Sequence, residues 1–425
     1  MIIEKIYKIF LSHSSVQTDT RKIKKGDLFF ALKGPNFNGN EFALKALEMG
    51  AVYAIVDEVI EGTNDQIILV DDVLSTLQAL AKYHRKQFNI PFIAITGSNG
   101  KTTSKELIYA VLSSHFKTYT TQGNLNNHIG VPLTILSVDK DAEMAVIEMG
   151  ANHQKEIEGY CEYTLPTHGV ITNCGKAHLE GFGGVEGVRK GKGELFNFIR
   201  QHNGAIFIYA DYDYLKTMSS GIQNKIVYGQ SEGMLQGSVL QNEPFLQVSI
   251  TKGLSVDRIN SQLVGDYNLP NILCAAAIGK HFGVPDEKIK SAIENYIPSN
   301  SRSQLIKKGS NEIILDAYNA NPSSMKVAIE NFAGLKSNKK ILLLGAMMEL
   351  GEDSILEHEL LVKLIQQYKW DAVVLVGGDF AKIEHPYIYL STSDQAKAWF
   401  DSQHYDNATI LIKGSRSFAM EKVIG

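Results

Sequence analysis

The 425-residue chain contains only three cysteines, two tryptophans and no long uninterrupted run of apolar residues. Cys161, Cys174 and Cys274 form an odd set without C-x-x-C spacing, which argues against a disulfide framework and against a cysteine-bound zinc ion. No segment approaches the ~18 consecutive apolar residues that a membrane helix needs, and charged residues interrupt the apolar start of the chain. These absences favour a cytoplasmic protein without an integral membrane segment.

Charge of one sign is not in excess either. The chain has 42 lysines and arginines against 46 aspartates and glutamates, for a formal net charge of -4. Such a balance provides no general attraction for nucleic acid, so a polyanionic ligand has to be held by a local basic pocket. The length suits about three domains of ~150 residues each, and we expect a monomer that binds no nucleic acid.

What the sequence does contain is a repeated alternation of short β-rich and helical runs, which predicts an α/β fold in three domains. Residues 1–88 are predicted to form a small mixed α/β domain. Residues 89–299 are predicted to form a central P-loop ATPase-like domain on a parallel sheet, with antiparallel strands at its edge over residues 225–265. Residues 300–425 are predicted to form a Rossmann-like, doubly wound domain.

A strand-like run at residues 92–96 leads into the stretch TGSNGKTT, after which a helical pattern opens at Lys101. Backbone N–H groups of a glycine turn at a helix N-terminus attract an anion. Lys101 can reach the β- and γ-phosphates of a nucleotide, and the Thr102 hydroxyl can ligate Mg²⁺. Only the G-K-S/T end of the phosphate-binding pattern matches, because Ile95 occupies the position where the pattern usually has its first glycine. A capped helix with a solvated lysine is the alternative, but the strand before and the helix after favour a nucleotide site. The predicted contacts are Gly97, Ser98, Asn99, Gly100, Lys101, Thr102 and Thr103.

Two further residues follow predicted strands, at the edge where doubly wound sheets bind ligands. Glu148 lies near the end of a strand at 143–149, and His178 follows a strand at 168–172. A carboxylate and an imidazole in these places can bind a metal ion, although a solvent-facing glutamate and a structural histidine are the alternatives. Lys192, in the stretch GVRKGKGELF, has by its pattern alone no role beyond that of a solvated helix residue.

The motifs TGSNGKTT, IEMGANHQKEI, ITNCGKAHLEGFGGVEGV and the following GKGE resemble, in sequence and order, those of the Mur ligases, the ATP-dependent amide-forming enzymes of peptidoglycan assembly. The resemblance implies that Lys192 is carbamylated and binds a second Mg²⁺ together with His178, while Glu148 serves a Mg²⁺ near the phosphates. The implied catalytic residues are therefore Lys101, Glu148, His178 and Lys192, and the implied metal ligands are Thr102, Glu148, His178 and Lys192.

Four more stretches, DTRKIKKGDLFFALKG, TQGNLNNHIGVPLTIL, LDAYNANPSSM and LGAMMELGEDSILEHEL, resemble the family members that join D-alanyl-D-alanine to UDP-N-acetylmuramoyl-tripeptide. The resemblance implies that ATP converts the tripeptide carboxylate to an acyl phosphate. The dipeptide amine then attacks it to give the pentapeptide peptidoglycan precursor, ADP and phosphate. The alternatives are a UDP-N-acetylmuramoyl-dipeptide ligase that adds the third stem residue, a folylpolyglutamate-synthetase-like ligase, and a nucleotide-dependent switch that kept the fold.

The resemblance also assigns residues to each ligand, with the first domain holding the UDP end of one substrate. Arginine and lysine charges suit a diphosphate, and side-chain amides suit the donor and acceptor edge of adenine. The chain departs from the family at Tyr267, where histidine is more usual, and at Ser301, where glycine is usual. The implied substrate contacts are Asp19, Thr20, Arg21, Lys33, Asn38, Asn126, Asn127, Tyr318, Asn319, Asn321, Lys413, Ser415 and Arg416. The implied nucleotide contacts outside the loop are Asn268, Asn271, Arg302 and Asp316.

Overall fold

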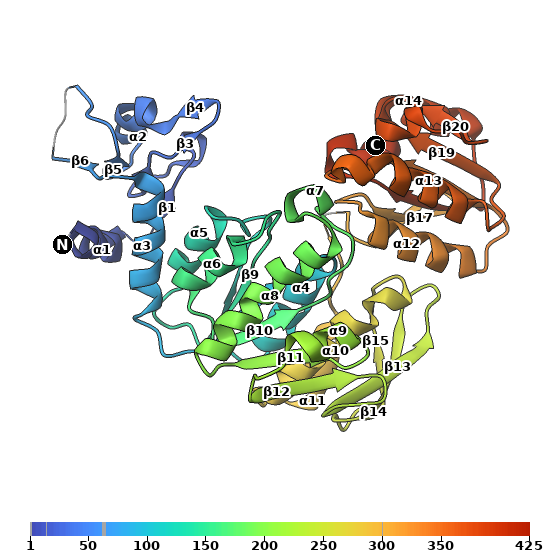
Figure 1. The fold of residues 1–425 in the computed structure, drawn as a ribbon, viewed down its shortest axis with the longest axis horizontal. Coiled ribbons are helices and arrows are strands. Elements are labelled where there is room, and N and C mark those ends of the chain that lie inside the picture. The colour runs from blue at the N-terminus through green and yellow to red at the C-terminus, as the bar shows by residue number, and fades with distance from the viewer. Residues whose placement is uncertain (1, 14, 62–64, 300) are drawn as a thin grey trace.

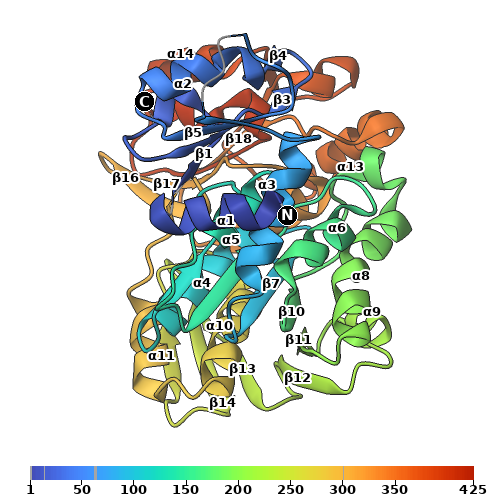
Figure 2. The same ribbon diagram turned by 90° about the vertical axis from the view of Figure 1, so that its left-hand side faces the viewer.

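The computed structural model describes residues 2–13, 15–61, 65–299 and 301–425 and builds their strands into four sheets (Figure 1). The N-terminal part, blue in Figure 1, and the C-terminal part, orange to red, lie at the same end of the central part in both views (Figures 1 and 2). Among the described residues, no helix has the length and apolar character needed to cross a bilayer. The predicted α/β fold class is confirmed.

The N-terminal part is a small parallel sheet with helices packed against it. The strand order is β1–β2–β5–β6, and every neighbouring pair is parallel. A short antiparallel hairpin, β3–β4, forms a separate sheet. The strands are β1 (Val16–Gln17), β2 (Leu28–Phe30), β3 (Lys33–Gly34), β4 (Phe37–Asn38), β5 (Tyr53–Val56) and β6 (Ile67–Leu69). The helices are α1 (Ile2–His13), α2 (Ala43–Glu48) and α3 (Val73–Arg85), with 3-10 turns η1 (Thr20–Lys22) and η2 (Gly39–Phe42).

The C-terminal end of α3 ties the N-terminal part to the central part. The guanidinium of Arg85 is buried there. It donates hydrogen bonds to the backbone carbonyls of Phe88, Thr164 and Leu165 at 2.9, 2.9 and 3.0 Å, and lies 3.8 Å from the ring centroid of Phe92. Burial lowers the pKa of Arg85 to about 10. The side chain therefore stays charged at neutral pH, and its hydrogen bonds hold α3 on the central part.

The central part is a nine-stranded sheet in the order β15–β14–β13–β12–β11–β10–β7–β9–β8. The strands from β13 to β8 in this order pair in parallel, while β14 pairs antiparallel with both β13 and β15. The antiparallel edge lies where the sequence predicts it, except that β12 is parallel to its neighbours because helix α9 connects it to β11 as a crossover. The strands are β7 (Phe92–Thr96), β8 (Thr118–Thr120), β9 (Met144–Glu148), β10 (His168–Ile171), β11 (Ala205–Tyr209), β12 (Asn224–Gly229), β13 (Leu235–Gln241), β14 (Gln247–Lys252) and β15 (Arg258–Asn260).

Helices cover both faces of the parallel region, and every residue of β7 and β9 is buried, as expected for strands of a covered parallel sheet. Helix α4 begins at Lys101, as the sequence predicts. The helices are α4 (Lys101–Ser113), α5 (Gly130–Leu136), α6 (Glu156–Thr164), α7 (Leu179–Phe182), α8 (Val185–Gln201), α9 (Asp213–Met218), α10 (Leu269–His281) and α11 (Asp286–Glu294), with the 3-10 turn η3 (Asp266–Asn268).

The C-terminal part is a six-stranded sheet in the order β16–β17–β21–β18–β19–β20. Only β16 and β17 are antiparallel, so the sheet is doubly wound with one antiparallel edge strand. The strands are β16 (Gln304–Lys308), β17 (Asn311–Asp316), β18 (Lys340–Gly345), β19 (Ala372–Val376), β20 (Ile388–Leu390) and β21 (Thr409–Lys413). The helices are α12 (Pro322–Gly334), α13 (Ser354–Ile365) and α14 (Ser393–Gln403), with 3-10 turns η4 (Gly351–Asp353), η5 (Gly378–Lys382), η6 (Arg416–Phe418) and η7 (Met420–Ile424).

Candidate active site

A cavity of about 880 Å³ lies between the central and C-terminal parts, at the carboxyl ends of their parallel strands. Its walls come from the loops after β7, β9 and β10 and from those after β17 and β18. The structure brings most of the predicted site residues together in this cavity. They are Ser98, Asn99, Gly100, Lys101, Thr102, Thr103, Asn126, Asn127, Glu148, His178, Asn268, Asn271, Arg302, Asp316, Tyr318, Asn319, Asn321 and Lys413.

The loop after β7 has the backbone geometry of an anion cradle. Gly97 and Gly100 have φ values of 148° and 77°, which disfavour any other residue. A Cβ at Gly97 would lie 2.0 Å from Thr172 Oγ1, and one at Gly100 would lie 2.7 Å from Asn271 Oδ1. Because Gly100 immediately precedes α4, the loop ends at the positive end of a helix dipole.

Asn173, directly after β10, holds this loop in shape. Its backbone oxygen accepts a hydrogen bond from Ser98 N at 2.9 Å, and its side-chain oxygen accepts one from Asn99 N at 3.0 Å. Its Nδ2 donates to Asn99 O at 3.0 Å, and the Thr172 hydroxyl donates to the same oxygen at 2.6 Å. Asn173 was not predicted from the sequence, although it follows a strand, which is the signal that pointed to Glu148.

Glu148, Thr102 and Asn126 form a polar cluster next to the loop. The Thr102 hydroxyl donates to Glu148 Oε1 at 3.1 Å, and Asn126 Nδ2 donates to the same oxygen at 2.8 Å. Glu148 Oε2 is buried and has no hydrogen-bond partner within the part of the chain that the structure describes. A buried carboxylate oxygen without a donor is costly, and Mg²⁺ prefers oxygen ligands of this kind. The cluster therefore fits a Mg²⁺ ion.

Lys192 lies behind the cavity wall. Its side chain is 1% exposed, its Nζ donates to Ala151 O at 2.9 Å, and the Nζ lies 4.7 Å from the ring centroid of Phe182. Burial, with a smaller effect from the charge of Lys101, lowers the pKa of Lys192 to about 7. The amine is therefore partly neutral at pH 7, which is the form that can add to CO₂.

The C-terminal part contributes two cations to the cavity, Arg302 and Lys413, which differ in their interaction partners. The Arg302 guanidinium lies 3.5 Å from the ring centroid of Tyr318, and its buried Nε has no hydrogen-bond acceptor among the described residues. The Nζ of Lys413, by contrast, pairs with Asp316 at 2.5 Å. Burial lowers the pKa of Lys101, the charge of Glu148 opposes this shift and that of Arg302 reinforces it. Among the described residues of the cavity, Lys101 and Arg302 are thus the lysine and arginine that no carboxylate pairs with, and they can meet an anionic ligand.

Two side-chain contacts join the loop after β10 to the C-terminal part. Lys176 Nζ pairs with the buried carboxylate of Glu357 at 2.5 Å, and His178 Nδ1 pairs with Glu349. The backbone N–H of Lys176 also donates to the Ser323 hydroxyl at 2.8 Å. The C-terminal part is therefore in contact with the central part across the cavity.

Asparagine side chains join the remaining segments around the phosphate loop. Asn321 Nδ2, at the start of α12, donates to Asn99 Oδ1 at 2.8 Å. Asn271 Oδ1 accepts a hydrogen bond from the Ser104 hydroxyl at 3.0 Å, while its Nδ2 donates to Asn268 Oδ1 at 2.8 Å. The amides predicted to contact adenine are therefore oriented by each other and by α4.

Some predicted residues lie outside the cavity. Ser415 is buried, and its hydroxyl donates to Ala320 O at 3.2 Å and accepts from Met348 N at 3.1 Å. Arg416 is exposed and pairs with Glu421 at 3.3 Å. Neither side chain lines the cavity, and backbone groups already engage the Ser415 hydroxyl.

The residues predicted to hold the UDP end all lie in the N-terminal part, away from this cavity. Asp19 caps η1 and pairs with Arg21 at 2.8 Å. Lys33 and Asn38 lie on the β3–β4 hairpin, and both contact Glu58, at 2.8 and 2.9 Å. The N-terminal part thus holds two polar groups, one around Asp19 and one around the β3–β4 hairpin. The second group includes Glu58, an acidic residue that was not predicted from the sequence.

Among the cavity residues that were not predicted from the sequence are two tyrosines and a glutamate. Tyr212 and Tyr214 follow β11 and lie with nearly parallel rings, 5.5 Å between centroids. Glu349 follows β18 and lines the wall supplied by the C-terminal part. A carboxylate shortly after an apolar strand is the pattern that identified Glu148, so the signal for Glu349 was present.

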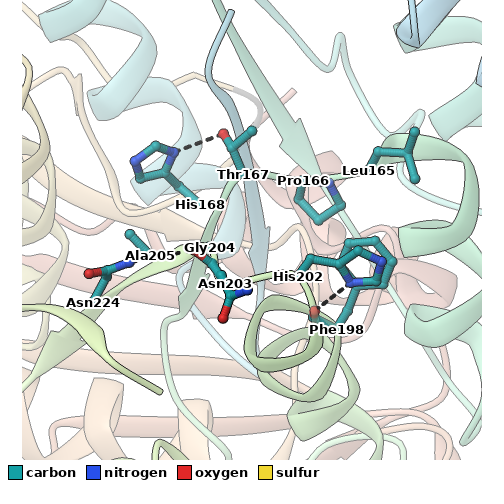
Figure 3. Close-up of a pocket in the computed structure, with 10 residues that line it drawn as sticks. All are labelled: Leu165, Pro166, Thr167, His168, Phe198, His202, Asn203, Gly204, Ala205 and Asn224. Carbon is teal, nitrogen blue, oxygen red and sulfur yellow. Dashed lines mark hydrogen bonds between the residues drawn. The ribbon is translucent and has the colours of Figure 1, made fainter. Parts of the chain in front are cut away.

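A second hollow, of about 430 Å³, lies at the opposite edge of the central sheet (Figure 3). Its residues precede or begin β10, β11 and β12. His168 Nδ1 is hydrogen-bonded to the Thr167 hydroxyl at 2.9 Å, and His202 Nδ1 to Phe198 O at 2.8 Å (Figure 3). None of the predicted site residues, all of which the structure describes, lines this hollow, so the first cavity is the candidate active site.

Three family descriptions match successive segments of the chain. The Mur ligase family catalytic domain matches residues 13–85, the Mur ligase middle domain residues 95–279, and the Mur ligase glutamate ligase domain residues 301–416.

Individual relatives match over nearly the whole length. The UDP-N-acetylmuramoyl-tripeptide–D-alanyl-D-alanine ligase of Bacillus subtilis (strain 168) is 34% identical, covering 96% of this chain and 92% of that protein. The protein of the same name from Escherichia coli (strain K12) is 35% identical, with the same two coverages. A crystal structure of MurF from Acinetobacter baumannii superposes with a TM-score of 0.87 at 29% identity, covering 96% of this chain and 92% of that one. MurF ligase from Thermotoga maritima in complex with ADP gives 0.87 at 26% identity, covering 97% of each chain.

The cavity places a phosphate loop on a parallel sheet opposite a doubly wound part. This is the arrangement of a nucleotide-dependent enzyme. The chain belongs to the Mur ligase family. Within that family it is similar to the MurF enzymes along its full length, which confirms the resemblance seen in the motifs.

Proposed function

We propose that the protein uses ATP to ligate D-alanyl-D-alanine to UDP-N-acetylmuramoyl-tripeptide, giving the pentapeptide precursor, ADP and phosphate. The observation that carries the proposal is the single cavity that joins the phosphate loop and Glu148 to Arg302 of the C-terminal part. It is supported by relatives that bear the name of this activity and match along their length. In this proposal the enzyme acts as a monomer in the cytoplasm.

ATP would be held by the loop at residues 97–103, by the Asn268 and Asn271 amides, and by Arg302 and Asp316. Thr102 and Glu148 would hold Mg²⁺, which neutralises phosphate charge when bound. A second Mg²⁺ would require His178 and a carbamate on Lys192, because the Lys192 ammonium is a donor whereas a carbamate presents oxygen ligands.

The chain's own residues would supply binding, charge and protection from water. ATP supplies the phosphoryl group that turns the tripeptide carboxylate into an acyl phosphate with a good leaving group. Lys101 and Arg302 place positive charge where phosphate charge increases during this transfer. The contacts of Lys176 and Asn321 between the two parts would draw them together over the cavity, which would protect an acyl phosphate from hydrolysis until the amine attacks.

The three predicted domains would divide the substrates among them. Residues 1–88 would bind the UDP end through the Asp19–Arg21 turn and the β3–β4 hairpin. Residues 89–299 would bind ATP and, through Asn126 and Asn127, the peptide stem. Residues 300–425 would bind the acceptor, with Tyr318, Asn319 and Lys413 in the cavity and Arg416 at its rim.

The test is a product assay with purified protein, ATP, UDP-N-acetylmuramoyl-tripeptides that carry lysine or diaminopimelate at the third position, and D-alanyl-D-alanine. We expect ADP and the pentapeptide product, identified by mass, only when both other substrates are present. Ligation of lysine or diaminopimelate to the UDP-dipeptide would instead establish the alternative activity. ADP release that needs neither substrate would favour a nucleotide-dependent switch.

A further inference from the structure

Glu349 lines the active-site cavity, yet none of the steps above uses it. The backbone on its N-terminal side is anchored twice. Met347 N donates to His358 Nε2 at 3.1 Å, and Met348 N donates to the Ser415 hydroxyl at 3.1 Å. Glu349 itself has a φ of 63°, in the left-handed region that costs free energy for a residue other than glycine. The surrounding contacts therefore hold this carboxylate in a defined place.

Glu349 also differs from the other carboxylates of the cavity in its partners. Asp316 is neutralised by Lys413 at 2.5 Å. Glu148 accepts hydrogen bonds from two side chains, and Glu156 accepts them from two backbone amides at 2.7 and 3.0 Å. Glu349 pairs with no lysine or arginine in the described ranges, and its side chain is 50% exposed. Of the cavity carboxylates that are not assigned to Mg²⁺, Glu349 is thus the one most able to receive a cation from a ligand.

The position of Glu349 between the two parts indicates which cation that is. Its carboxylate lies within ion-pair distance of His178 Nδ1 of the central part, so it faces the central part across the interface. On the nucleotide side of the cavity, Lys101 and Arg302 offer no charge partner to an ammonium group, and the Glu148 carboxylate next to Lys101 is assigned to Mg²⁺. An amine entering this cavity therefore finds its favourable charge partner at Glu349.

We propose that Glu349 binds the amino group of the acceptor dipeptide and orients it toward the activated carboxylate, an inference that rests on the proposed function. The acceptor arrives as a zwitterion at neutral pH. In the ligation step its nitrogen forms the C–N bond, the C–O bond to phosphate breaks, and phosphate leaves with the electron pair. The ammonium loses two protons, one to the leaving phosphate and one to water. Glu349 binds the nucleophile and is not consumed.

This assignment makes acceptor binding depend on the contact between the two parts. Glu349 belongs to the C-terminal part, whereas the phosphate loop and Glu148 belong to the central part. The amine is brought to the reacting carbon only when the two parts meet, as they do through the Lys176–Glu357 pair. The dipeptide would therefore be positioned in the arrangement that excludes water.

The test compares Glu349→Gln and Glu349→Asp with the control Glu352→Gln, which changes an exposed carboxylate of η4 outside the cavity lining. For Glu349→Gln we expect the KM for D-alanyl-D-alanine to rise about 5-fold, as for loss of one partner of a half-exposed charge pair. The KM values for ATP and tripeptide should stay within about 2-fold, because no step assigned to them uses Glu349. Glu349→Asp keeps the charge and should recover part of the loss. Glu352→Gln should behave as wild type.

Hydroxylamine separates acceptor binding from a structural effect, because it is a neutral nucleophile at pH 7 that traps an acyl phosphate as a hydroxamate. Glu349→Gln should keep most of its hydroxamate formation while it loses ligation of the dipeptide. An unchanged KM for the dipeptide, or an equal loss of both reactions, would overturn the role. A greater Mg²⁺ requirement with an unchanged dipeptide KM would make Glu349 part of the metal site instead. A wild-type enzyme that does not accept D-alanyl-D-alanine would overturn the proposed function as well.

Discussion

The hydroxyl of Thr102 and the carboxylate of Glu148 are joined by a hydrogen bond of 3.1 Å across 46 residues of sequence. Strands β7 and β9 pair in parallel, so the loop after one and the last residue of the other meet at the same edge of the sheet. The second oxygen of Glu148 is buried and lacks a hydrogen-bond partner in the described ranges. This relationship underlies the proposed Mg²⁺ site and its first test.

Glu148→Gln keeps the shape of the side chain but removes its charge. We expect turnover to fall about 10²-fold or more, since a lost contact to the charge of the transition state has that effect. The measurement is ADP release in the presence of both substrates, over a range of Mg²⁺ concentrations. Glu232→Gln, which breaks an exposed pair with Lys216, is the control. Wild-type turnover of Glu148→Gln at ordinary Mg²⁺ concentrations would exclude the proposed metal site.

Tyr318 is expected to position Arg302 for the nucleotide, because the guanidinium lies 3.5 Å from its ring centroid. Tyr318→Leu removes a cation–π contact of about 0.5–2 kcal/mol, so the KM for ATP should rise by about 2- to 30-fold. Tyr318→Phe keeps the ring and serves as the matched control. Equal KM values for the two variants would show that the ring does not orient Arg302.

Lys192→Ala should abolish ligation while leaving most of the nucleotide affinity, because Lys101 and the backbone cradle remain. Lys192→Glu restores a carboxylate at shorter reach and should recover a little activity. Carbon-13 NMR of the wild-type protein in labelled bicarbonate should show a carbamate resonance that Lys192→Ala lacks. Normal turnover of Lys192→Ala would remove this residue from the mechanism.

The Lys176–Glu357 pair is expected to favour the closed arrangement, since one partner is buried at the interface. Lys176→Ala leaves the Glu357 carboxylate unpaired, so the ligand-free protein should have a larger radius of gyration than wild type in solution scattering. An ATP analogue together with the UDP substrate should make the variant compact again. Lys190→Ala, at an exposed helix position, is the control. Identical scattering profiles of the two ligand-free variants would contradict this role.

His168 predicts a pH dependence of stability. Burial, reinforced by the charge of His281, lowers its pKa to about 4. The unfolded chain binds a proton near pH 6.5 whereas the folded protein does not, so stability is fully present above pH 6.5 and is lost as the pH falls toward 4. The loss from this group is about 3 kcal/mol at most, at about 1.4 kcal/mol per pKa unit.

The measurement is the difference in the free energy of unfolding between wild type and His168→Gln at pH 7.5 and at pH 5. Glutamine keeps a polar side chain next to Thr167 but does not titrate. The variant should lose less stability on acidification than wild type. A difference that does not change with pH would mean that folding does not lower the pKa of His168.

Sequence patterns predicted those parts of the candidate site that depend on residues close together in the chain. The glycine turn before Lys101 is a property of local backbone conformation, and its position between a strand and a helix follows from periodicity. The place of Glu148 at a strand end likewise follows from the alternation of elements, because parallel strands bring their carboxyl ends to one edge.

The α/β class, the three alternating segments and the phosphate loop could be predicted from the residues alone, because these features arise from local propensity and hydrophobic period. The folded chain was needed to show that Lys192 is buried rather than solvated, that Asp316 pairs with Lys413, and that Glu349 faces His178. Each of these outcomes depends on the burial and distance of groups from segments far apart in the chain. The electrostatic interaction between two charges depends on their separation in space and on the surrounding dielectric, and neither quantity is encoded in the spacing of residues along the sequence.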